Sequence, residues 1–124
     1  MPARANPQPD RATELSAAIV RIAEFWSLSN AKLGVILGLS APTVSRLKRG
    51  TTAIDPASKS FEAGQFLLRL FRSLDALLGS DDAAAKRWLE TPNLDLGGKP
   101  IEKLDTMRGL IELCDYVDFY RARV

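Results

Sequence analysis

The stretch from Ser29 to Gly50 constrains the fold most, because its residues follow the order expected of two short helices joined by a tight turn. Ser29 and Ser40 are each suited to cap the start of a helix through the side-chain hydroxyl. Gly38 lies between them and can adopt the positive φ angle that ends a helix. The apolar residues of the stretch recur at helical spacing and are predicted to face inward: Leu33, Ile36, Leu37, Leu39, Val44 and Leu47.

The second of these helices leaves small, hydroxylic and basic side chains on its outer surface. Such a surface suits the major groove of DNA, where hydroxyl and guanidinium groups reach base edges. We predict base contacts from Thr43, Ser45 and Arg46. An ordinary helical hairpin with a solvated basic face is the alternative. Lys32, Lys48 and Arg49 are predicted to contact phosphate. The complete predicted DNA-binding set is Asn30, Lys32, Ala41, Thr43, Ser45, Arg46, Lys48 and Arg49.

Charge is distributed unevenly along the chain, whose formal net charge is +2. Residues 25–54 contain four basic residues and no acidic residue, whereas residues 55–124 contain 10 basic and 12 acidic residues. A basic segment beside a slightly acidic remainder indicates a nucleic-acid partner for that segment alone.

The remaining sequence predicts further helices, so we expect an all-α fold. Residues 1–12 are predicted to be a flexible arm, residues 13–58 the helix-turn-helix domain, and residues 59–124 a small helical domain. A long helix from Phe61 to Leu78 carries an apolar stripe broad enough to meet several neighbours, among which a second copy of the chain would give a homodimer. The last helix carries Met107, Leu110, Ile111, Cys114 and Val117 on one face, where Cys114 is expected to be buried.

Composition argues against catalysis and against a metal or cofactor site. The chain has one Cys and no His, which excludes the usual zinc sites, a disulfide framework and imidazole acid–base chemistry. The loop NLDLGGKP contains glycines but lacks the spacing of a phosphate-binding loop. No segment has the length of a membrane span and no apolar signal region is present, so we expect a cytoplasmic protein that is not an enzyme.

The stretch from Ser29 to Gly50 resembles the helix-turn-helix of the Xre/Cro-like family of DNA-binding domains. Asn30 stands where that family commonly has Gln, and Gly34 where it requires a very small residue. Ala41 and Pro42 depart from the family pattern, because many members place polar base readers at these two positions.

The segment from Trp88 onward contains a series of short motifs: Trp88-Leu89, Pro92-Asn93, Leu96-Gly97-Gly98, Pro100-Ile101, Thr106 and Gly109. In this order they resemble the toxin-binding domain of the MbcA/ParS/Xre antitoxin family. The resemblance implies an antitoxin that binds its own promoter and neutralises a RES-domain toxin, an enzyme that attacks NAD. A stand-alone Xre-like repressor with a C-terminal dimerisation domain is the alternative.

The resemblance places toxin binding in the last helix and in the residues that follow it. Aromatic and Arg side chains gather there, and these residue types anchor protein interfaces. The alternative is that Phe119 and Tyr120 complete the core of this chain. The predicted toxin-binding residues, which would occlude the toxin's active site, are Asp115, Tyr116, Asp118, Phe119, Tyr120, Arg121, Arg123 and Val124.

Overall fold

The computed structural model describes residues 10–123. Over this range the chain is helical, with one isolated antiparallel bridge between Asn93 and Gly98. The predicted all-α fold is confirmed, and no helix in the described range is long and apolar enough to cross a membrane. The elements in chain order are α1 (Arg11–Phe25), α2 (Asn30–Leu37), α3 (Ala41–Arg49), α4 (Lys59–Leu77), α5 (Asp82–Glu90), the 3-10 helices η1 (Leu94–Leu96) and η2 (Pro100–Asp105), and α6 (Met107–Arg121).

Side-chain caps fix where the first three helices begin. Ser29 Oγ accepts a hydrogen bond from Lys32 N at 3.0 Å, and Ser40 Oγ accepts one from Thr43 N at 3.4 Å, so both predicted caps are confirmed. Asp10 Oδ1 accepts a hydrogen bond from Thr13 N at 2.7 Å and caps α1. This helix therefore begins at Arg11, inside the segment expected to be an arm, whose first nine residues lie outside the described range.

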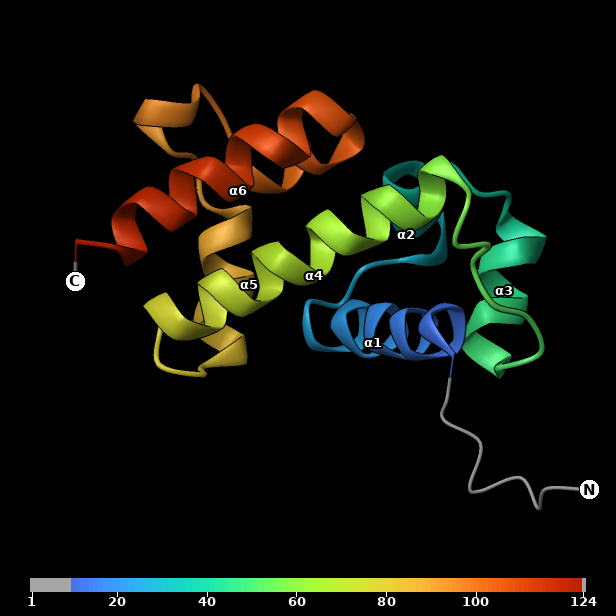
Figure 1. Ribbon diagram of the computed structural model, residues 1–124. Coiled ribbons are helices and arrows are strands. Elements are labelled where there is room, and N and C mark those ends of the chain that lie inside the picture. Colours follow the sequence, from blue (N-terminus) through green and yellow to red (C-terminus); the bar gives the residue numbers. More distant parts are fainter. Residues whose placement is uncertain (1–9, 124) are drawn as a thin grey trace, which may run out of the picture.

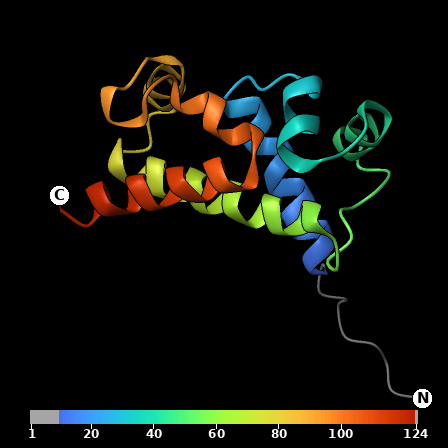
Figure 2. The ribbon, with the colours of Figure 1, turned by 90° about the horizontal axis from the view of Figure 1, so that it is seen from above.

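Helix α4 is the central element of the molecule. Figures 1 and 2 show α6 lying alongside α4 and running in the same direction, and α1 also packs against α4. Helices α2 and α5 contact α4 as well. The broad apolar stripe of α4 is therefore covered largely by the chain's own helices, so its breadth does not by itself require a second copy of the chain.

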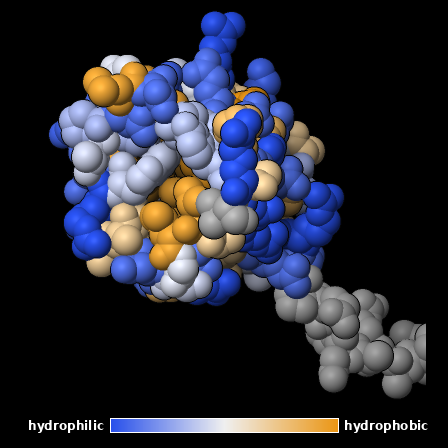
Figure 3. All heavy atoms as spheres, turned by 90° about the vertical axis from the view of Figure 1, so that its left-hand side faces the viewer, coloured by the Kyte–Doolittle hydropathy of each residue, from blue (hydrophilic) through white to orange (hydrophobic). Residues whose placement is uncertain are grey.

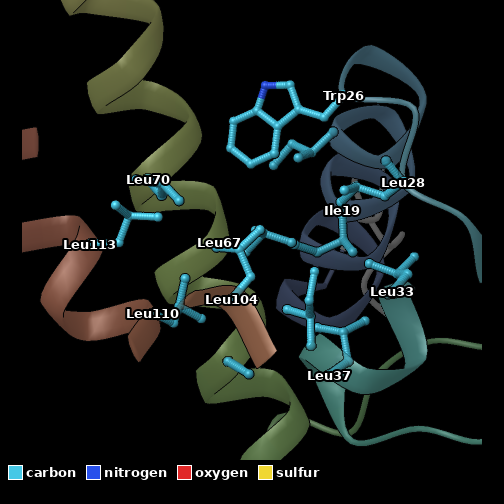
Figure 4. Close-up of a cluster of buried hydrophobic side chains, with 14 of the residues drawn as sticks. Ile19, Trp26, Leu28, Leu33, Leu37, Leu67, Leu70, Leu104, Leu110 and Leu113 are labelled. Atoms are coloured by element: carbon cyan, nitrogen blue, oxygen red, sulfur yellow. The ribbon is translucent and has the colours of Figure 1, made fainter. Parts of the chain in front are cut away.

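One hydrophobic core runs through both halves of the chain. Figure 4 shows Leu33 and Leu37 of α2 on one side of Leu67, and Leu104 and Leu110 on its other side. Leu33, Leu67 and Leu104 are each 0% exposed. The helix-turn-helix and the C-terminal helices therefore share a core, which holds the two halves in one arrangement.

Two glycines allow backbone segments to approach closely. A Cβ atom on Gly34 would lie 2.7 Å from the carbonyl oxygen of Leu39, so a small residue is required where α2 turns toward α3. A Cβ atom on Gly109 would lie 2.2 Å from the carbonyl oxygen of Lys103. Thr106 Oγ1 accepts a hydrogen bond from Gly109 N at 3.0 Å, so Thr106 and Gly109 together seat the first turn of α6 against η2.

Candidate functional site

Helix α3 is oriented by two buried side chains. Val44 is 0% exposed and Leu47 is 4% exposed, as predicted. Gly38 ends α2 with a φ angle of 68°, in the left-handed region that favours glycine. With Val44 and Leu47 facing the core, the opposite face of α3 is left on the surface of the molecule.

Arg46 is held along this surface by a short hydrogen-bond chain. Its Nη2 atom donates to Thr43 Oγ1 at 3.1 Å, and Thr43 Oγ1 lies 3.0 Å from Ser40 Oγ. Arg46, Lys48 and Arg49 occupy the last turn of α3. Within residues 10–123 these three cations form no ion pair, so their charge is available to phosphate or to base edges.

Lys32, which was expected to contact phosphate, forms an ion pair with the C-terminal half of the chain. Its Nζ atom is 2.5 Å from Asp105 Oδ1, and its side chain is only 22% exposed. Asp105 lies 73 positions away, on η2. Local sequence contains no signal for this pair, because only the shared core brings α2 and η2 together.

A shallow cleft of about 330 Å³ separates the start of α3 from α2. Val35 on its α2 side is 54% exposed, and Ala41 on its α3 side is also exposed. No charged side chain lines the cleft, whose residues are Asn30, Ala31, Gly34, Val35, Gly38, Leu39 and Ala41.

The opposite end of the molecule carries a chain of aromatic rings. The ring centroids of Trp88 and Tyr116 lie 6.5 Å apart, those of Tyr116 and Tyr120 lie 4.9 Å apart, and those of Phe119 and Tyr120 lie 5.6 Å apart. Phe119 is 53% exposed and Tyr120 is 40% exposed, so neither ring completes the core.

Three of these rings line a hollow of about 270 Å³, whose residues are Leu77, Trp88, Tyr116, Val117 and Tyr120. Figure 3 views this end of the molecule and shows hydrophobic atoms gathered in a hollow within a more hydrophilic surface. We call these five residues together with Phe119 the aromatic end surface. Leu77 and Trp88 were not among the predicted contact residues, because α4 and α5 reach this surface only through the fold.

Asp95, in η1, holds two tyrosines of the aromatic end surface. Its Oδ2 atom accepts hydrogen bonds from Tyr116 Oη at 2.9 Å and from Tyr120 Oη at 3.4 Å. Loss of solvation, together with the neighbouring Asp95 carboxylate, raises the pKa of Tyr116 to about 12. Tyr116 therefore stays protonated near neutral pH and continues to donate this hydrogen bond.

The acidic residues of α6 are paired within the chain. Asp118 accepts hydrogen bonds from Ser73 Oγ and from Arg69 Nε, the latter at 3.0 Å. Partial burial acts to raise the pKa of Asp118, but the hydrogen bonds from Ser73 and Arg69 outweigh it and hold the pKa below its usual value. Asp118 was expected to face the toxin, whereas here it connects α6 to α4. Asp115 lies 3.4 Å from the same Arg69, with its side chain 67% exposed, and remains on the surface.

Two exposed cations, Arg121 and Arg123, lie at the end of α6 and shortly after it. The Arg123 guanidinium lies 4.2 Å from the centroid of the Phe119 ring, and Arg121 ends α6. Val124, the last predicted contact residue, lies outside the described range.

Other reactive groups are few in the described part of the chain. Cys114 is buried as predicted, and burial raises the pKa of its thiol to about 11, so it stays in the unreactive thiol form. Among residues 10–123, no group of three or more His, Cys, Asp or Glu side chains is placed to hold a metal ion.

Comparison with known families assigns each half of the chain separately. The model for the antitoxin Xre-like helix-turn-helix domain matches residues 7–72. The model for the antitoxin Xre/MbcA/ParS C-terminal toxin-binding domain matches residues 73–123. Neither describes a class of enzymes. A search of the curated proteins finds no match to this chain.

Proposed function

Because the chain belongs to the Xre/MbcA/ParS family of antitoxins, we propose that it neutralises a RES-domain toxin that degrades NAD and that it represses its own operon. The observation that carries this proposal is the coincidence of the toxin-binding match with the aromatic end surface. Every residue of that surface lies within residues 73–123. The protein acts as the antitoxin of a type II system in the cytoplasm.

Neutralisation works by covering the mouth of the toxin's active site. Phe119 and Tyr120 supply exposed aromatic area beside an apolar hollow, the arrangement that interface anchors use. An NAD-binding pocket must accommodate phosphate and therefore offers basic groups, which Asp115 can meet from its exposed position. Arg121 and Arg123 lie at the rim of the contact, where they pair with acidic groups of the toxin.

Repression uses α3 in the major groove of operator DNA. The uncompensated cations at the end of α3 support this role. One short recognition helix reads few base pairs, so the protein binds as a homodimer on a palindromic site. Sedimentation at roughly tens of micromolar, the range of ordinary dimer affinities, checks this state, and a monomer there would contradict it.

Co-expression with the product of the adjacent gene tests the antitoxin role. The double variant Phe119→Ala, Tyr120→Ala removes both exposed rings and leaves Asp118 and its partners in place. We expect it to fold and to bind DNA, yet to lose copurification with the toxin and protection of growth and cellular NAD. Phe25→Ala is the matched control, because Phe25 is a 45% exposed aromatic residue on α1. Full protection by the double variant would place the toxin contact elsewhere.

A further inference from the structure

The cleft between α2 and α3 presents an apolar surface on the half of the molecule that we propose binds DNA. We infer that Ala41, at the edge of this cleft, and its neighbour Pro42 read thymine methyl groups in the major groove. The inference rests on the proposed DNA binding and deepens it by naming the base that the start of α3 selects.

The position of the two residues makes them the first to meet the bases. In a helix-turn-helix, the N-terminal residues of the second helix approach base edges. Ala41 and Pro42 are the first two residues of α3, and both are exposed. Ser40, which precedes them, is occupied as the helix cap and lies 3.0 Å from Thr43 Oγ1. The leading groups of α3 are therefore a methyl group and a pyrrolidine ring.

Only one base offers such groups an apolar partner. In the major groove, thymine presents a C5-methyl group beside its O4 acceptor, whereas the edges of the other bases present hydrogen-bond donors and acceptors without a methyl group. Placing Ala41 or Pro42 against a donor or acceptor would remove its water without supplying a new hydrogen bond, which is unfavourable. Placing Ala41 or Pro42 against a thymine methyl group removes apolar surface from water on both sides, which is favourable.

The cleft behind Ala41 supplies room and a matching surface. Its volume is about 330 Å³, and Val35, 54% exposed, lines its far side. The exposure of Val35 beside a helix that faces DNA is explained if a thymine methyl group packs against its side chain. The uncompensated cations of α3 supply the attraction to phosphate that brings this uncharged surface to the bases.

The test begins with selection of bound sequences from a pool of random DNA duplexes by the full chain. Each thymine of the enriched sequence is then replaced singly by deoxyuridine, which lacks only the methyl group. We expect at least one thymine at which the replacement weakens binding about fourfold, because burying a group of this size contributes about 0.8 kcal/mol.

Protein variants assign that methyl contact to the start of α3. The ratio of affinities for thymine and deoxyuridine duplexes should fall toward one in Ala41→Gly. Pro42→Ala, which retains a residue compatible with the helix, should reduce the same ratio. Ala83→Gly is the matched control, because Ala83 is an exposed alanine in the first turn of α5. It should leave the ratio unchanged.

The possible outcomes distinguish a failure of thymine methyl readout from a failure of the proposed DNA binding. A selected site whose affinity is the same with every deoxyuridine replacement overturns methyl readout and leaves DNA binding intact. A methyl effect that persists in both Ala41→Gly and Pro42→Ala also overturns it. Failure to enrich any sequence from the pool overturns both this inference and the proposed repression.

Discussion

Lys32 Nζ lies 2.5 Å from Asp105 Oδ1, and this ion pair connects α2 of the DNA-binding half to η2 of the toxin-binding half. Leu104, which precedes Asp105, is 0% exposed, so the core sets the position of the carboxylate. A lysine whose charge is paired with a carboxylate is not free to neutralise a phosphate, so it displaces no counterion from the DNA. We therefore expect Lys32 to stabilise the arrangement of the two halves and to contribute little to phosphate binding.

The first prediction compares Lys32→Ala with Lys48→Ala on random-sequence duplex DNA. Lys48→Ala should reduce the slope of log K against log salt concentration by about one, because it removes one phosphate contact. Lys32→Ala should leave that slope unchanged. Fluorescence anisotropy at several salt concentrations measures both slopes. An equal reduction of the slope in the two variants would show that Lys32 contacts phosphate.

The second prediction concerns the hydrogen bond from Arg46 to Thr43, which spans 3.1 Å. Arg46→Ala should weaken binding to the selected site by about 1–3 kcal/mol and flatten its preference over random DNA. Thr43→Val keeps a similar shape but loses the hydroxyl that orients the guanidinium, so it should show a smaller loss with the same salt slope. If Arg46→Ala weakens only non-specific binding, Arg46 contacts phosphate rather than a base.

The helix-turn-helix could be predicted from the sequence because its determinants are local. The caps Ser29 and Ser40 act on residues three positions away, and Gly38 acts at its own position. The pairs that join distant elements could not be predicted in this way. Arg69 and Asp118 are 49 positions apart, and no periodicity indicates which acidic residue meets which basic one.

The last helix shows a subtler limit of pattern analysis. Ile111 was expected on its buried face, but Leu113 is 0% exposed and Ile111 is only half-buried. The buried face turns toward Leu113 because α6 packs against both α4 and η2. Spacing alone defines a stripe of apolar residues, whereas the positions of the neighbouring elements decide which edge of the stripe is covered.

The third prediction concerns the contact between Gly109 and η2. Gly109→Ala should lower the free energy of unfolding by about 1–3 kcal/mol, because its Cβ would meet the backbone carbonyl of Lys103 at 2.2 Å. Gly98→Ala is the matched control, since its Cβ would come no closer than 3.7 Å to Glu102 Oε1. Its effect should stay within about 0.5 kcal/mol. Urea unfolding measures both, and equal stabilities would show that η2 moves aside without cost.

The fourth prediction concerns the carboxylate of Asp118, which accepts hydrogen bonds from Ser73 and Arg69. Asp118→Ala should lower the free energy of unfolding by about 1–2 kcal/mol at neutral pH, because Ser73 is 3% exposed and loses its partner. Asp115→Ala should have little effect, since that side chain is 67% exposed.

Because the pKa of Asp118 is lowered by folding, the contribution of Asp118 to the free energy of unfolding is present above the unfolded-state pKa and disappears as pH falls through the folded-state pKa. The stability difference between wild type and Asp118→Ala, measured by urea unfolding at neutral and acidic pH, should therefore shrink in acid. A difference that is the same at both pH values would mean that packing, rather than the charged hydrogen bonds, connects α6 to α4.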